Sequence, residues 1–259
     1  MPIIGSLCFE ILMKIYLNCT ANLGDFVQSL PVLSGLYKEY GPIDFYIRHE
    51  MRKFCGLKEF LMYQDIFNKV EFDDEVREAV DSVYILSSWT REDKNDPNRP
   101  IETCRYENWL KDNYKFRFDV NDSFEIKFPD VDIELKDNYY VGDRWYTPDI
   151  DARRECHVLA HLDKFEFIDY KNTLLTNCYI IKKSSLPFIT NFTGIGMIAD
   201  LLNKETYVVW RAEDWKPEFR NGNDISWDNG KNINKIFEKH FYLNRRARLV
   251  HSNDLEDLL

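Results

Sequence analysis

A turn between a short apolar run and a helical pattern carries the residues best suited to chemistry. Gly24 and Asp25 stand at this turn, after the β-forming residues 14–19. In an open α/β sheet, ligands bind beyond the carboxyl ends of the strands, and a glycine there lets a ligand approach the backbone. A carboxylate in that place can act as a general base. Asp is also a favoured helix N-cap, and spacing alone favours the cap for Asp25.

A second turn of this kind stands in the C-terminal half. Thr193, Gly194 and Gly196 form a Thr-Gly-x-Gly sequence between an apolar run and a helical pattern. Backbone N–H groups at such a helix start attract phosphate. A glycine-containing loop that only makes a tight turn gives the same sequence. The turn is therefore either a phosphate site or a plain connection.

Two further places could contribute to a nucleotide site. Arg144 follows the first strand expected in the C-terminal half, and its guanidinium fork suits phosphate oxygens. A surface arginine is the plain alternative. Trp210 and Arg211 close a strongly apolar run, so they stand at the carboxyl end of a strand, where a nucleotide base or ribose could lie.

Residues 20–33 resemble the opening motif of the ADP-heptose:lipopolysaccharide heptosyltransferase family. That motif reads Gly-Asp-x-Val/Ile-x-x-Leu-Pro-x-Leu after a first strand, and this chain has Gly24, Asp25, Val27, Leu30, Pro31 and Leu33 in that order. The resemblance implies a GT-B glycosyltransferase, in which two Rossmann-like domains face a cleft. It gives Asp25 the role of catalytic base. We expect Asn22, Gly24 and Gln28 to line the cleft beside it.

The C-terminal turn is similar to the Asp-Thr-Gly-x-x-His donor motif of the same family. Thr193 and Gly194 match, whereas Phe192 stands in place of the Asp and Met197 in place of the His. A backbone phosphate site is compatible with this sequence. The loss of both polar side chains points to a distant relative with a different sugar or acceptor.

Residues 140–148 loosely resemble the Lys-x-Trp-Pro loop of the family's donor domain. Trp145 matches, the Lys position is Asp143, and Arg144 lies one residue away. The resemblance places Trp145 in the donor site. We expect Arg144 to face the diphosphate there, since its guanidinium fork suits phosphate oxygens. No cofactor is implied, because GT-B enzymes generally lack a catalytic metal and the nucleotide sugar is a co-substrate.

The elements that position these residues follow from hydrophobic periodicity. The predicted strands cover residues 14–19, 43–47, 69–72, 83–86, 139–141, 178–181 and 206–210, with a short apolar run at 187–190. The predicted helices cover 25–40, 52–63, 152–161, 196–202 and 231–241. Pro31 lacks an N–H, so the first helix should bend or loosen there. Strands alternating with helices indicate a parallel sheet wrapped by crossover helices.

The fold class is therefore α/β, with two Rossmann-like domains facing a cleft in a GT-B-like arrangement. We expect residues 1–134 to form an acceptor-side domain that carries the Gly-Asp motif. Residues 135–259 should form the nucleotide-sugar donor domain. The apolar start of the chain lacks a basic n-region and is too short to span a bilayer, so no membrane anchor is expected.

The balance of charge limits the partners. The chain has 44 acidic and 34 basic residues, a formal net charge of −10, and so repels polyanions as a whole. Contact with nucleic acid needs a local basic face. One candidate face gathers near the C-terminus, as Lys231, Lys235, Lys239, His240, Arg245, Arg246 and Arg248. A solvated helix face is the plain alternative.

No metal site is expected. His157 and His161 are four residues apart on a predicted helix, but no third ligand stands near them. The pairs Asp130–Asp132 and Asp149–Asp151 have the Asp-x-Asp form of metal-dependent transferases; in so acidic a chain such pairs arise easily, and we interpret them as solvated. The six cysteines are scattered and form no C-x-x-C pair, which favours reduced thiols in a cytoplasm, of a bacterium or of a virus-infected cell.

These observations predict an enzyme, a metal-independent glycosyltransferase that uses Asp25 as base in a direct displacement. Its partners would be a nucleotide-sugar donor and an acceptor hydroxyl, on a glycan or on a hydroxymethylated base in viral DNA. Whether it transfers a hexose, a heptose or a pentose stays open. The alternative is a non-catalytic binder of nucleotides or nucleotide sugars, which the apolar Phe192 and Met197 favour.

Overall fold

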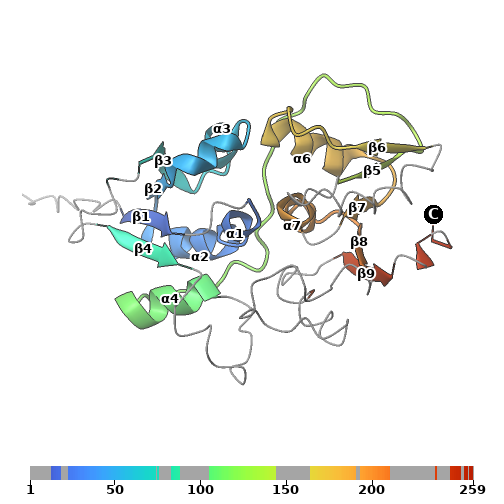
Figure 1. Ribbon diagram of the computed structural model, residues 1–259. Helices are drawn as coiled ribbons and strands as arrows, with labels where there is room; N and C mark the ends of the chain where they lie inside the picture. The colour runs from blue at the N-terminus through green and yellow to red at the C-terminus, as the bar shows by residue number, and fades with distance from the viewer. Residues whose placement is uncertain are drawn as a thin grey trace, which may run out of the picture.

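The structure, a computed structural model, contains two groups of strands and helices (Figure 1). It describes residues 13–18, 23–73, 75, 83–87, 105–143, 164–190, 193–210, 237, 246–251, 254, 255, 257 and 258. Within these ranges, no helix has the length and apolar character needed to cross a bilayer. The predicted helix over 152–161 lies outside the described residues, as does the helix over 231–241 except for the helical residue Phe237.

The first sheet has four parallel strands in the order β3-β2-β1-β4. These strands are β1 (Met13–Asn18), β2 (Ile43–Ile47), β3 (Phe67–Phe72) and β4 (Tyr84–Ser87). Every residue of β2 is buried, as expected for an inner strand of a parallel sheet that is covered on both faces. The strand order reverses between β1 and β4, so the topological switch point of this sheet lies at the carboxyl ends of these two strands.

The predicted helix over residues 25–40 is divided into α1 (Leu23–Val27) and α2 (Leu30–Tyr40). Pro31 has no N–H to donate to the carbonyl of Val27, and the Ser29 hydroxyl donates to the carbonyl oxygen of Phe26 at 2.7 Å. The helix therefore opens just before Pro31, which confirms the predicted loosening and corrects the single helix.

Other local differences from the predicted elements also have backbone causes. The predicted helix over residues 52–63 is divided into a 3-10 helix, η1 (His49–Lys53), and α3 (Leu57–Met62). Gly56 separates them with a φ of 70°, in the left-handed region that favours glycine. Helix α4 (Arg105–Tyr114) was not predicted; it packs on β4, where the Trp109 indole donates to the Ile85 carbonyl at 2.7 Å.

The second sheet has five parallel strands in the order β6-β5-β7-β8-β9. They are β5 (Tyr140–Gly142), β6 (Phe165–Phe167), β7 (Phe188–Thr190), β8 (Thr206–Trp210) and β9 (Ala247–His251). Numbered within this half, the order is 2-1-3-4-5, one of the two common doubly wound orders. Its switch point lies between the carboxyl ends of β5 and β7. The predicted strand over 206–210 is confirmed as β8.

The predicted strand over residues 178–181 is wrong, because these residues lie inside α6 (Leu174–Lys183). The run reads as a strand by composition, but Leu174, Cys178 and Ile181 are buried at helical spacing. The helix starts at Thr173, whose hydroxyl accepts the Thr176 N–H at 3.2 Å. The helix predicted over 196–202 is present as α7 (Gly194–Leu201), two residues longer at its start.

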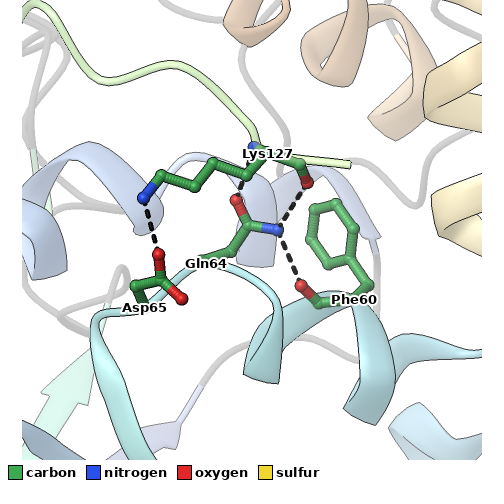
Figure 2. A network of polar contacts seen from close by, with 4 residues as sticks. All are labelled: Phe60, Gln64, Asp65 and Lys127. Atoms are coloured by element: carbon green, nitrogen blue, oxygen red, sulfur yellow. Dashed lines mark hydrogen bonds and ion pairs between the residues drawn. The ribbon is translucent and has the colours of Figure 1, made fainter. Parts of the chain in front are cut away.

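An extended segment, residues 115–139, connects the two halves and is bound to both. Figure 2 shows its contact with Gln64, a side chain that is only 2% exposed. The Gln64 amide donates to the carbonyls of Phe60 at 2.7 Å and Lys127 at 3.1 Å, and its oxygen accepts the Lys127 N–H at 2.9 Å. The Lys127 ammonium forms an exposed ion pair with Asp65 at 2.7 Å.

The same segment lies on α2 before it reaches the second half. The Asn121 N–H donates to the carbonyl of Pro31 at 3.1 Å, and its amide donates to the Ser34 hydroxyl at 2.8 Å. Further along, the Ile126 N–H donates to the carbonyl of Leu201, at the end of α7, at 3.1 Å. Buried side chains of both halves form one continuous apolar cluster. The predicted domain boundary at residues 134 and 135 falls within this segment and stays a prediction.

Candidate active site

The loops at the two switch points meet through a pair of glycines. Gly24 lies in the first turn of α1, the helix that follows β1, and Gly194 begins α7, the helix that follows β7. A Cβ atom at residue 194 would lie 2.6 Å from the amide nitrogen of Gly24 and 2.7 Å from the Cβ of Leu23. Only a residue without a side chain permits this approach. Figure 1 shows α1 and α7 next to each other where the two halves meet.

Asp25, the predicted base, belongs to α1, and its side chain lies outside the described part of the structure. The helix begins at Leu23, so Asp25 occupies its first turn and is not the N-cap residue. The N–H of Gln28 donates to the carbonyl of Gly24 at 3.1 Å and closes this turn. Asn22, predicted beside them, lies outside the described residues.

The Thr-Gly-x-Gly turn forms the start of α7, as the sequence predicted. Thr193 is the N-cap, and its hydroxyl accepts the N–H of Gly196 at 3.1 Å. The N–H of Met197 donates to the carbonyl of Thr193 at 3.1 Å. Two of the N–H groups at this helix start are therefore satisfied within the turn itself.

A buried carboxylate lies beside this N-cap. Asp143 directly follows β5 and is 3% exposed. One carboxylate oxygen accepts the hydroxyl of Thr193, and the other accepts the hydroxyl of Tyr170. Because Thr193 donates to Asp143, the Thr190 hydroxyl donates to Thr193 in turn, at an oxygen–oxygen distance of 3.2 Å. A negative charge at the start of α7 interacts favourably with the helix dipole.

Asp143 and Thr193 lie on the two sides of the second switch point. Asp143 stands at the carboxyl end of β5, and Thr190 and Thr193 stand at the carboxyl end of β7. The crevice outside such a point is where open α/β sheets bind ligands. The hydrogen bonds of Asp143 therefore connect the two strands that define the donor-side position.

Met197 occupies the place where the related motif has a histidine. It is 5% exposed, and its thioether sulfur would lie 3.1 Å from a Cβ atom at Gly24. An apolar, flexible side chain therefore fills the space between α7 and the Gly-Asp turn. This contact belongs to the packing of the two halves.

The structure does not describe the side chains of the remaining residues predicted for the donor site. Arg144, Trp145 and Arg211 are not among the described residues, and Trp210 ends β8 with a side chain that is not described. Phe192, which replaces the Asp of the related motif, is not described either. The structure thus brings together Gly24, Thr193, Gly194 and Gly196, whereas the expected cation and the expected aromatic residues stay predictions.

The part of the chain that the structure describes contains no group of three or more His, Cys, Asp or Glu side chains arranged as a metal site. In the first Asp-x-Asp pair, Asp130 is exposed and lies 3.5 Å from the ammonium of Lys183. The second pair and the two predicted helical histidines lie outside the described residues.

Sequence reasoning did not find the roles of Asp143, Tyr170 and Thr190. Asp143 was considered only as a mismatch to a lysine in a related motif. The available signal was its position immediately after a predicted strand, together with Thr190 at the end of the next apolar run. Their meeting depends on β5 and β7 being neighbours, and that strand order is not readable from periodicity.

The comparison with known proteins gives a consistent result for the fold. No protein-family model matches the chain, and a search of curated proteins found no match. Among solved structures, the chain is similar to the glycosyl transferase family 9 protein from Veillonella parvula. The TM-score is 0.58 at 11% identity, over 95% of this chain and 88% of that one.

Two further solved structures resemble the chain. One is the bacterial iron-containing dodecameric glycosyltransferase TibC from enterotoxigenic E. coli, with a TM-score of 0.50 and 11% identity, covering 90% of this chain and 73% of that one. The other is the E. coli heptosyltransferase WaaC with ADP, with a TM-score of 0.49 and 11% identity over 88% of this chain and all of that one.

The first of these similarities and the two parallel sheets define the class of fold. The chain is an α/β protein with two Rossmann-like halves in the GT-B arrangement. The distant likeness to heptosyltransferase-type glycosyltransferases, predicted from the Gly-Asp motif, is confirmed at the level of the fold.

Proposed function

We propose that this chain is a glycosyltransferase that moves a sugar from a nucleotide-sugar donor to an acceptor hydroxyl. The observation that carries the proposal is the contact between Gly24 and Gly194. It joins the loops that follow the switch-point strands β1 and β7, one in each half. Since open α/β sheets bind ligands outside their switch points, a donor and an acceptor held at these two loops would lie close together.

In this proposal Asp25 is the catalytic base. Its carboxylate takes the proton of the acceptor hydroxyl while that oxygen forms a bond to the anomeric carbon. The bond from that carbon to the diphosphate oxygen breaks at the same time, and the nucleoside diphosphate leaves with the electron pair. A positioned base of this kind contributes roughly 10²- to 10⁴-fold to the rate. The position of Asp25 in the first turn of α1, next to Gly24, supports the assignment.

The donor diphosphate would lie at the start of α7. Thr193, Gly194 and Gly196 supply a helix N-terminus, which favours phosphate oxygens. Asp143 contributes a negative charge beside the same helix end, so the diphosphate also needs a nearby cation. We propose Arg144, the next residue in the chain, for that role, with Trp145, Trp210 and Arg211 completing the donor site.

For the acceptor we propose a hydroxyl on a glycan or on a hydroxymethylated base in DNA. The basic region near the C-terminus would face a polyanionic acceptor. Of its residues, the structure describes Arg246 and Arg248, whose guanidinium groups lie 3.5 and 3.7 Å from the Glu205 carboxylate. The free thiols of Cys55 and Cys178 agree with a reducing cytoplasm, where we propose that the enzyme acts.

The test is release of nucleoside diphosphate from a panel of nucleotide sugars, with glycans and hydroxymethylated DNA as acceptors. The Asp25→Asn variant should lose roughly 10²- to 10⁴-fold in turnover and still bind the donor. Asp73→Asn is the matched control, because Asp73 follows β3 at the outer edge of the same sheet, away from the switch point. Full turnover by Asp25→Asn would show that Asp25 is not the base.

A second candidate function is a non-catalytic nucleotide or nucleotide-sugar binding protein. The observation that favours it is the apolar contact of Met197 with Gly24, in place of a polar side chain between the two loops. This function predicts thermal stabilisation by nucleotides without turnover on any acceptor of the panel. Turnover that depends on Asp25 would exclude it.

A further inference from the structure

Tyr170 combines an exposed ring with an anchored hydroxyl. The residue is 42% exposed, whereas its hydroxyl donates to Asp143, which is 3% exposed. A tyrosine fixed in this way presents a flat aromatic surface with little rotational freedom left to lose. Such a surface suits a planar ligand, because ordering the side chain adds little entropic cost on binding.

The ring is linked to the start of α7 through a single carboxylate. Tyr170 and Thr193 donate to opposite oxygens of Asp143. The two hydroxyls are therefore separated by the width of one carboxylate group and its hydrogen bonds. A ligand whose phosphate group binds at Thr193–Gly194 would therefore lie close to Tyr170.

The loop that carries Tyr170 reaches the first half at its end. Tyr170 belongs to the loop between β6 and α6, and three residues later Thr173 packs against Gly56, where an added Cβ would lie 2.8 Å from the Thr173 Cβ. The next N–H, of Leu174, donates to the carbonyl of Cys55 at 3.0 Å. Figure 1 shows α6 beside α3 and α7 beside α1, and the loop that carries Tyr170 ends at the first of these two contacts.

From these observations we infer that Tyr170 is the surface on which the nucleobase of a nucleoside diphosphate stacks. Asp143 acts as a positioning residue that fixes the ring relative to the phosphate-binding turn. Every nucleobase has a π-face, so stacking of this kind binds the nucleotide without selecting one base. The inference rests on the proposed function, which places the diphosphate at α7. It adds that Tyr170 recognises the base of the nucleotide.

The test is direct binding of nucleoside diphosphates (ADP, GDP, UDP, CDP and TDP) and of pyrophosphate to the full chain by calorimetry. Tyr170→Ala should lower the affinity for nucleoside diphosphates by about tenfold or more. It should leave the affinity for pyrophosphate unchanged, because pyrophosphate has no base. Tyr170→Phe, which keeps the ring, should lose less than Tyr170→Ala. The control is Tyr63→Ala, which removes a tyrosine of similar exposure, 41%, at the end of α3.

A double-variant cycle tests the positioning role of Asp143. Removal of the Asp143 charge acts on the diphosphate of every ligand, so the affinity for nucleoside diphosphates is compared with that for pyrophosphate. Asp143→Asn should lower the affinity for nucleoside diphosphates relative to that for pyrophosphate, and in the Tyr170→Ala background it should cause no further relative loss. If Asp143 had a purely structural role, Asp143→Asn would lower the nucleotide affinity equally in the wild type and in Tyr170→Ala. It would also lower the affinity for pyrophosphate by the same factor.

The outcomes separate this inference from the proposed function. If the wild type binds nucleoside diphosphates and Tyr170→Ala binds them equally well, the stacking assignment is wrong and the proposed function is untouched. Equal weakening of nucleotides and pyrophosphate by Tyr170→Ala would also overturn the assignment. If the wild type binds no nucleoside diphosphate, the proposed function and the inference fail together.

Discussion

Gly194 packs against Gly24 so closely that a methyl group on residue 194 would lie 2.6 Å from the Gly24 amide nitrogen. The reverse addition is far less restricted, because a Cβ on Gly24 would lie 3.1 Å from the Met197 sulfur and 3.2 Å from its terminal methyl group. One glycine thus meets rigid backbone, and the other meets the flexible end of a side chain. The two halves are joined at this point, and there is no room for a side chain at residue 194 of α7.

This asymmetry predicts different effects of the two alanine substitutions. Gly194→Ala should lower the free energy of unfolding by about 1–3 kcal/mol, because α7 or α1 has to shift to remove the overlap. Gly24→Ala should cost less, because the Met197 thioether can move by a few tenths of an ångström. Urea unfolding of both variants measures the difference.

The matched pair also distinguishes local packing from a general intolerance of alanine in these helices. A larger loss for Gly24→Ala than for Gly194→Ala would contradict the contact geometry. If Gly194→Ala separates the halves without unfolding them, the urea transition should broaden or divide, since each half would then unfold by itself.

Much of the fold was accessible from periodicity and composition. The strands 43–47 and 206–210 were predicted with the bounds that the structure has, because both are apolar runs of buried parallel strands. The strand predicted over 178–181 failed because its β-forming residues also satisfy the spacing of a buried helix face. Helix α4 escaped prediction because its sequence is largely polar, and only tertiary contacts such as Trp109 with Ile85 hold it on the sheet.

The candidate site was harder to predict from the sequence. Gly24 and Gly194 could be singled out as turn residues, but nothing in their spacing predicts that they touch, since they are separated by the whole linking segment. The hydrogen-bond network of the buried Asp143 with Tyr170 and Thr193 joins residues from three loops. Such a network follows from the order of β6, β5 and β7 in the sheet, which is a tertiary property.

A second prediction concerns the segment that connects the halves. Gln64→Ala should lower the free energy of unfolding by about 2 kcal/mol, because it removes two donated hydrogen bonds and one accepted bond and leaves a cavity. Lys127→Ala is the control: it deletes only the exposed ion pair with Asp65 and should change stability by less than about 1 kcal/mol. Equal losses in thermal or urea unfolding would show that the buried amide network (Figure 2) does not fasten the segment.

A third prediction concerns thiol reactivity. Burial raises the pKa of the Cys178 thiol far above its usual range, and the side chain is fully buried in α6. Because the thiolate is the reactive form, Cys178 should resist alkylation in the native protein, whereas the exposed Cys55 should be modified. Peptide mapping after brief iodoacetamide treatment, with and without denaturant, measures both sites. Modification of Cys178 at the rate of Cys55 without denaturant would contradict the packing of α6.

A buried lysine provides a prediction on pH dependence. Lys204 follows α7 and is 9% exposed, and its ammonium donates to the carbonyl of Ser184 at 2.5 Å. Burial is the main cause that lowers the pKa of Lys204 to about 8, followed by the charges of Arg246 and Lys182, while Glu205 acts in the opposite direction. In the unfolded chain the pKa returns to its usual value near 10.5.

The sign of the effect follows from proton linkage. Between about pH 8 and 10.5 the unfolded chain holds the Lys204 proton more firmly than the folded chain, so folding is favoured as the pH rises through this window. Below pH 8 Lys204 is protonated in both states, and the folded chain carries the full free-energy cost of burying its charge. Relative to Lys204→Met, which keeps the apolar stem without a charge, the wild type should gain on the order of 2–3 kcal/mol across the window. Urea unfolding at several pH values measures the difference, and Lys58→Met, at an exposed position of α3, controls for the titration of other lysines. A wild type that loses stability relative to Lys204→Met as the pH rises would show that the folded protein binds the Lys204 proton more tightly than the unfolded chain does.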